Sequence, residues 1–167
     1  MKQNQDFQKE MFLEMQGQFL EFMKNNANNT INSNNTVNSH NKTFNLNMFL
    51  NEKCKDAISM DAFIKSIEVS LSNLLLTKDK GLADGISNIF IENMSKLSLY
   101  ERPVHCTDAK RETLYIKNDT WEKDTENKDG LLKTIHIVAD KNRKEMKKWQ
   151  GENPKYDFVD TREYELH

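Results

Sequence analysis

The sequence has few of the features that mark secreted, membrane-spanning or cofactor-binding proteins. It contains two cysteines among 167 residues, which is too few for a disulfide framework and favours an intracellular protein with reduced thiols. No apolar run approaches the ~18 residues of a membrane-spanning helix. Glutamate and glutamine interrupt the apolar residues near the N-terminus, so this stretch does not match the core of a signal peptide. We therefore expect a protein that is neither secreted nor membrane-bound.

An excess of positive charge is also lacking. The net charge is −2 and the mean hydropathy is −0.83. Because proteins that bind nucleic acid over a wide surface are usually basic, any such contact in this chain has to be local. The sequence has no glycine-rich phosphate loop, and its cysteines and histidines lack the paired spacing of a structural zinc site. We expect no metal and no cofactor.

The composition changes along the chain and divides it into four parts. We expect an oligomerisation helix in residues 1–24, an Asn-rich linker or β-stalk in 25–50, a globular module in 51–152 and a short tail in 153–167. The length agrees with one domain plus an extension. The fold class that we expect is α+β, with three helices and a short antiparallel β-hairpin in the module.

The first part shows the spacing of a coiled coil. Within a helix expected over about residues 5–24, Phe12, Met15, Phe19 and Phe22 are separated by 3, 4 and 3 positions. About two heptads are marginal as an isolated helix in water, so this apolar seam needs a partner. The partner is either the chain's own core or another copy. We favour self-association because a long polar segment separates the helix from the module, and among oligomers we favour a trimer.

The second part is rich in asparagine. Residues 25–47 hold eleven asparagines, and residues 28–39 repeat one six-residue unit twice. Such tracts are usually disordered, but Ile31 and Val37 would share one face of an extended strand. Apolar and polar residues then alternate through 43–50. A β-stalk between several copies is therefore the alternative to a disordered linker, and Ile31 and Val37 join the oligomerisation residues.

The module reads as two helices, a β region and a last helix. Helical periodicity predicts helices over about residues 60–76 and 82–97, separated by a turn at 77–81. Residues 100–124 change to a period of two, which predicts a hairpin or three short strands. A final helix is expected over about 127–150.

One glycine stands inside the second of these helices. Gly85 costs about 1 kcal/mol against alanine at such a position. It indicates either a later helix start or a close crossing of two helices.

Three stretches of the module carry a resemblance to known sequences. They are NSHNKTFNLNMFLNEKCKDAISMDAFIKSI, GISNIFIENMSKL and RPVHCTDAKRETLYIKNDTWEKD. Together, over about residues 38–150, they resemble a recurrent C-terminal region in uncharacterised proteins of Mimivirus-like giant viruses. Many of those proteins look like a zinc finger, a coiled coil and an Asn-rich spacer before this module. The finger has no counterpart here, so DNA binding by a finger does not transfer. The resemblance implies a viral protein acting in the cytoplasm of an infected cell or in a virion, and other viral proteins as further partners.

Two groups of residues are candidates for binding. The last helix has a basic face, with Lys133, Lys141, Arg143, Lys144 and Lys148 as candidate nucleic-acid contacts. The alternative is that these basic side chains only face solvent and bind no partner. A second candidate surface surrounds the hairpin and consists of Arg102, Asp108, Lys110, Arg111 and Trp121.

Catalysis finds little support in the sequence. His105 and Cys106 are of the right types for a Cys–His pair. Adjacent residues of a strand point to opposite faces, however, so they would not hydrogen-bond each other. We expect a non-enzymatic oligomeric interaction or assembly protein, and the alternative is a viral regulatory protein that binds nucleic acid.

Overall fold

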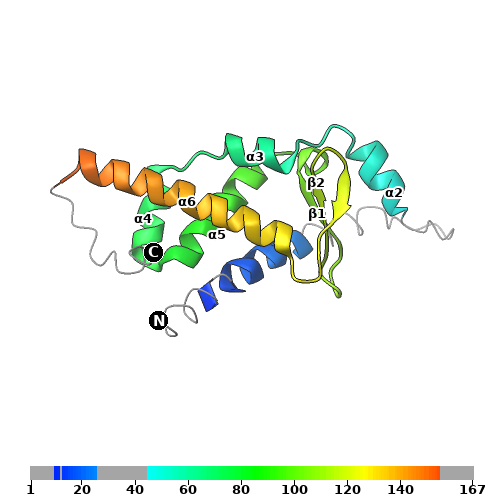
Figure 1. Ribbon diagram of the computed structural model, residues 1–167, viewed down its shortest axis with the longest axis horizontal. Coiled ribbons are helices and arrows are strands. Elements are labelled where there is room, and N and C mark those ends of the chain that lie inside the picture. Colours follow the sequence, from blue (N-terminus) through cyan, green and yellow to red (C-terminus); the bar gives the residue numbers. More distant parts are fainter. Residues whose placement is uncertain (1–9, 12, 26–44, 155–167) are drawn as a thin grey trace.

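The computed structural model describes residues 10–11, 13–25 and 45–154. Helices form most of it, and a small sheet lies near one end (Figure 1). The longest helix runs along most of the molecule and crosses the other helices of the module. The N-terminal helix lies beside the sheet and the start of this long helix.

The helices follow one another with short connections. The N-terminal helix comprises residues 10–11 and 13–25. After it come α2 (Leu46–Met48), the π-helical turn η1 (Phe49–Lys53), α3 (Met60–Ser66), α4 (Leu71–Lys80), α5 (Leu82–Ser95), the 3-10 turn η2 (Leu99–Glu101) and α6 (Asp129–Glu152). Among the described residues, none of these helices combines the length and the apolar character that crossing a bilayer requires.

The sheet has three antiparallel strands in the order β1 (Val104–Asp108), β2 (Thr113–Lys117) and β3 (Trp121–Lys123). The α+β class is confirmed. The strands form a three-stranded sheet and not only the expected hairpin, because Asn118-Asp119-Thr120 returns the chain into a third strand; three strands were the other arrangement that the sequence left open. One face of the sheet belongs to the main core, and the segment from α2 to residue 57 covers the other. The sheet thus separates a large core from a small one.

The single helix expected over residues 60–76 is in fact two helices, α3 and α4. The side chain of Ser70 accepts the backbone N–H of Asn73, and the Asn73 side chain accepts the backbone N–H of Ser70. This reciprocal capping box starts a new helix. The apolar periodicity continues through the break, so the spacing of apolar residues could not reveal where one helix ends and the next begins.

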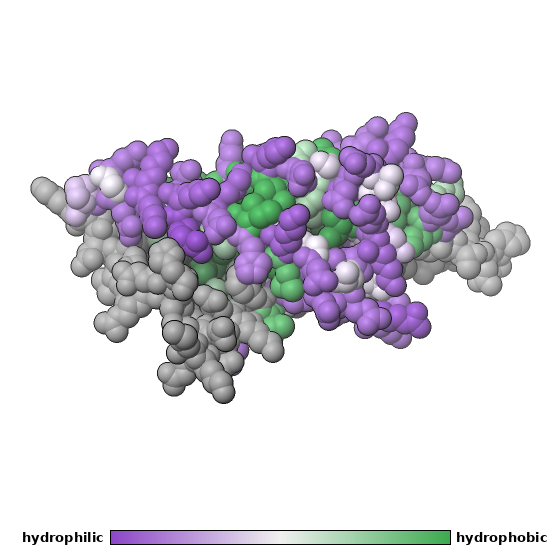
Figure 2. Space-filling view, viewed as in Figure 1, coloured by the Kyte–Doolittle hydropathy of each residue, from purple (hydrophilic) through white to green (hydrophobic). Residues whose placement is uncertain are grey.

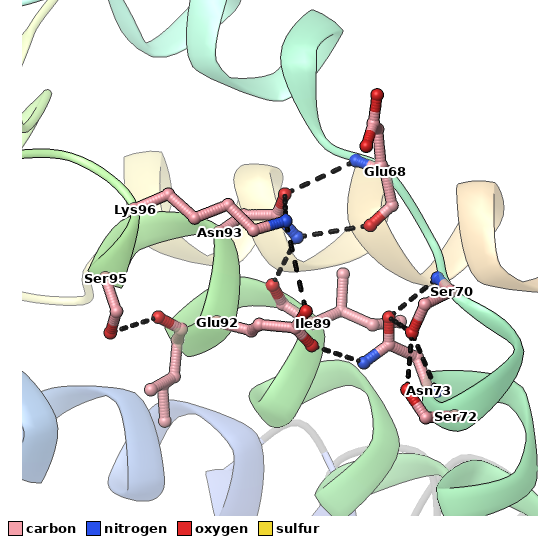
Figure 3. A network of polar contacts seen from close by, with 10 residues as sticks. Glu68, Ser70, Ser72, Asn73, Ile89, Glu92, Asn93, Ser95 and Lys96 are labelled. Atoms are coloured by element: carbon pink, nitrogen blue, oxygen red, sulfur yellow. Dashed lines mark hydrogen bonds and ion pairs between the residues drawn. The ribbon is translucent and has the colours of Figure 1, made fainter.

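Buried amides fix this break against α5 (Figure 3). The Asn93 side chain donates to the backbone carbonyl of Glu68 at 3.2 Å and accepts its N–H at 3.4 Å. The Asn73 side chain donates to the Glu92 carboxylate at 2.8 Å. These bonds give partners to the buried amides of Asn73 and Asn93 and connect Glu68, in the extended link between α3 and α4, to α5.

The close helix crossing at Gly85 is confirmed. A Cβ atom placed there would lie 2.0 Å from Thr77 Oγ1 and 2.8 Å from Thr77 Cα, so only glycine lets α4 and α5 approach this closely. The expected turn at 77–81 was too long. Helix α4 continues to Lys80, and the reversal occurs at Gly81, whose φ of +95° favours glycine.

The β-stalk that the sequence offered as an alternative is wrong for residues 45–50, the part of it that the structure describes. The Asn45 side chain accepts the backbone N–H of Met48 at 3.1 Å and starts a helical segment. Leu50 and Cys54, four positions apart, then lie at helical spacing and are buried together with Phe49. The remainder of the expected stalk, including Ile31 and Val37, lies outside the described residues.

Helix α6 starts close to the sheet. The Asp124 carboxylate accepts the backbone N–H groups of Gly130 at 2.9 Å and Leu131 at 3.1 Å, which caps the helix. A Cβ at Gly130 would lie 2.7 Å from Ile116 Cδ1. The expected bounds of 127–150 differ from the observed Asp129–Glu152 by two residues at each end.

Candidate functional site

The N-terminal helix fills a groove in the module. Met15, Phe19, Leu20 and Met23 are buried and belong to the same core cluster as residues of α3, α5, α6 and the sheet. Phe19 is 2% exposed. We call the surface of the module that this helix covers the helix groove. Phe90 contacts the helix there through Phe19, and Phe63, Ile86, Cys106 and Leu114 belong to the same buried cluster.

Aromatic rings line the centre of the helix groove. The Phe19 ring meets the Phe90 ring edge to face, with centroids 4.2 Å apart, and Phe63 meets Phe90 from another direction at 5.2 Å. Edge-to-face pairs of this kind contribute about 0.5–1.5 kcal/mol beyond the area that they bury. Phe19 is therefore the anchor of the helix.

Polar contacts hold the helix at two points. Gln18 Nε2 donates to Asp84 Oδ1 at 2.7 Å, near the start of α5. Lys24 forms an ion pair with Glu112 in the turn between β1 and β2, and the hydrogen bond to Glu112 raises the pKa of Lys24. Because these two partners lie on different elements of the module, the contacts fix the direction and the register of the helix.

The seam residues therefore have a partner within the chain. Met15 and Phe19 are buried in the helix groove, and Phe22 is half-buried beneath the Arg102 guanidinium, which lies 5.5 Å from its ring centroid. This corresponds to the alternative that the sequence left open, a helix folded back onto its own core, and the expected coiled coil is not shown. Phe12 lies outside the described residues. Self-association stays a prediction.

The basic face of α6 is smaller than expected. Lys141 Nζ donates to the backbone carbonyls of Ile64 at 2.6 Å, Lys65 at 3.3 Å and Ile67 at 3.2 Å, so it caps the C-terminus of α3. Arg143 pairs with Asp140 on its own helix at 2.9 Å.

Three of the five predicted basic residues remain exposed, and these are Lys133, Lys144 and Lys148. Figure 2 shows hydrophilic side chains over the C-terminal half of α6. Sequence spacing correctly placed Lys144 and Lys148 on one outer face, but it could not show that Lys141 is engaged.

The residues of the second candidate surface, around the sheet, do not form one continuous binding surface but have separate structural roles. The Asp108 carboxylate accepts the backbone N–H groups of Lys110 and Arg111, each at 3.0 Å, and these bonds lower its pKa. Asp108 therefore shapes the turn in which Lys110 and Arg111 are exposed. Arg102 packs on Phe22, and Trp121 belongs to the small core on the outer face of the sheet.

A buried Cys–His pair was missed by the sequence reasoning. Cys54 Sγ lies 3.6 Å from His105 Nε2, and both side chains are buried. The rings of Phe49 and Trp121 flank the imidazole at 5.1 Å and 5.4 Å. His105 and Cys106 do face opposite sides of β1, because Cys106 belongs to the main core. Leu50 and Cys54 are four positions apart, and this helical spacing is the signal that could have placed a cysteine beside the apolar residues over the sheet.

The environment keeps this pair uncharged. Burial and the positive charge of Arg102 lower the pKa of His105 to about 4. Burial raises the pKa of Cys54 to about 11. At neutral pH the pair consists of an imidazole and a thiol, whereas a catalytic cysteine requires a thiolate. The arrangement is that of a packed core residue with a weak hydrogen bond.

Metal ligands do not gather in the part of the chain that the structure describes, where no three His, Cys, Asp or Glu side chains are placed to hold an ion. No family model, curated protein or solved structure matches the chain.

Proposed function

We propose that this chain is a non-enzymatic interaction protein that assembles with copies of itself, as a component of a virion or of a scaffold in an infected cell. The observation that carries the proposal is the helix groove. Four side chains of the N-terminal helix, Met15, Phe19, Leu20 and Met23, are buried in the main core cluster of the module, and residues 26–44 connect that helix to the module along the chain. Binding of an amphipathic helix in an apolar groove is a recurrent mode of protein recognition.

The chemistry of the buried polar groups supports a role without catalysis. His105 and Cys54 are the pair that most resembles a nucleophile and its base, and both are neutral and sealed from solvent. The sequence resemblance to modules of Mimivirus-like viruses supports the viral setting.

Light scattering of the full chain over a range of concentrations tests the proposal. We expect oligomers of two or more chains, and we expect the fraction of chains in oligomers to increase with concentration. The trimer that the sequence favours is one such oligomer. A mass of one chain at every concentration would overturn the proposal.

Nucleic-acid binding is the second candidate, because Lys144, Lys147 and Lys148 lie exposed near the end of α6. Binding through phosphate contacts weakens steeply as salt increases. If this role applies, changing the three lysines to glutamate abolishes binding to a DNA duplex.

The matched control for this second role changes three exposed lysines elsewhere, Lys53, Lys55 and Lys65, to glutamate. It alters the net charge equally, so binding should survive. Equal loss in both triple variants would indicate attraction by overall charge and would reject α6 as the contact.

A further inference from the structure

The contacts in the helix groove point to a specific mode of assembly. We propose that the N-terminal helix is exchanged between copies, so that the helix of one chain occupies the helix groove of another. The inference rests on the proposed self-assembly and names its partner, a second copy of this chain, and its site.

Exchange would preserve every described contact between helix and module. The partners of the helix are the buried residues of the helix groove together with Asp84, Arg102 and Glu112, which all belong to the module. None of these contacts depends on whether the two parts share one chain. Exchange of an identical element is a low-cost route to oligomers for this reason.

The length of the connection allows the exchange. Nineteen residues, 26–44, join the helix to Asn45, and an extended chain of this length reaches about 65 Å. This exceeds the roughly 38 Å diameter of a sphere with the radius of gyration of about 15 Å expected for a domain of about 150 residues. A helix can therefore reach a neighbouring groove without displacing its own module.

The polar contacts make this helix the occupant rather than any amphipathic helix. Gln18 and Lys24 are six positions apart and must meet Asp84 and Glu112 at the same time.

Concentration decides between the two arrangements. The helix of the same chain competes with the helix of another chain for one helix groove, and its tether gives it an effective concentration on the order of mM. Exchange is therefore expected to increase with chain concentration and to dominate where many copies are gathered, as in a scaffold or a particle.

Crosslinking between two differently labelled full-length chains tests the inference. One chain carries Gln18→Cys and the other Asp84→Cys, and the chains are co-expressed or mixed and then treated with a short bis-maleimide. Both native cysteines are buried, and the wild-type chain controls for their reaction. Lys24→Cys with Glu112→Cys provides a second pair at the other end of the helix. Ser72→Cys, at an exposed position of α4, replaces Asp84→Cys in the matched control.

We expect a crosslinked heterodimer that exceeds the Ser72 control several-fold for both pairs and increases with concentration. If light scattering shows a multimer but the heterodimer does not exceed the control, exchange is wrong and self-assembly by another surface stands. If every sample has the mass of one chain and a chain carrying both cysteines of a pair links only within itself, exchange and self-assembly both fail.

Discussion

Phe19→Ala is the perturbation that probes the packing of the N-terminal helix most sharply. The ring is 2% exposed, belongs to the main core cluster and meets the Phe90 ring edge to face, with centroids 4.2 Å apart. Truncating a buried phenylalanine costs about 3–5 kcal/mol, because the side chain loses its burial and leaves a cavity. Since whole domains are stable by only about 5–15 kcal/mol, this is a large fraction of the free energy of unfolding.

The assay is urea denaturation followed by circular dichroism, which gives the free energy of unfolding from the midpoint and the slope. Leu13→Ala is the matched control, since Leu13 lies on the same helix and is 56% exposed. Substitutions at such surface positions usually stay within about 0.5 kcal/mol. We expect the Phe19 variant to lose about 3–5 kcal/mol and the Leu13 variant to change little.

Equal effects of the two substitutions would refute the reasoning. They would mean that Phe19 is as accessible as Leu13 and that the helix groove is empty in solution. If Phe19→Ala lowers the free energy of unfolding and leaves the denaturant slope unchanged, the variant exposes the same amount of surface on unfolding as the wild type, so its helix is still packed in the native state.

Three further predictions concern the module. Gly85→Ala is expected to destabilise the fold by more than about 2 kcal/mol, because the added methyl collides with backbone and side-chain atoms of α4. Its control is Gly17→Ala in the N-terminal helix, where the space is open and alanine should stabilise the helix by about 0.5–1 kcal/mol. Lys141→Met removes the cap of α3 and is expected to cost about 1 kcal/mol, while Lys144→Met should be neutral. His105 has a folded pKa of about 4 against 6.5, so the unfolded state binds more protons between these values and the free energy of unfolding should fall by about 2 kcal/mol from about pH 7.5 to about pH 5.

Each of these outcomes can be contradicted by denaturation curves of the same kind. Equal free energies of unfolding for the two glycine variants would contradict the close crossing of α4 and α5 at Gly85. Equal effects at the two lysines would show that the α3 carbonyls are satisfied otherwise. A His105→Gln chain with the same pH dependence as the wild type would assign that dependence to another group.

The elements with long, regular periodicity could be predicted from the sequence. The stripes of α5 and α6 placed both helices within about two residues of their ends, and the change to a period of two located the sheet. Gly85 also indicated a close crossing among the alternatives. These features follow from local spacing, which a single sequence carries.

The missed features depend on choices between competing local patterns. Residues 46–50 satisfy both an alternating and a helical spacing, and the side-chain cap from Asn45 decides for the helix. The break between α3 and α4 is set by the reciprocal bonds of Ser70 and Asn73, while the apolar residues continue as if one helix were present.

The site could be predicted only in part, because its residues meet through the tertiary fold. The seam of the N-terminal helix was visible, but not the surface that receives it. Cys54 and His105 are 51 positions apart and meet only when η1 covers the sheet. The engagement of Lys141 with α3 likewise spans 77 positions, so charge spacing along α6 could not reveal it.

Amide hydrogen exchange of the full chain tests the central claim most directly, which is that the N-terminal helix completes the core of the module. We expect the amides of residues 15–23 to be protected to a similar degree as those of α5, with which they share a hydrophobic cluster. Exchange of residues 15–23 at the rate of an unfolded peptide, while α5 stays protected, would contradict the account.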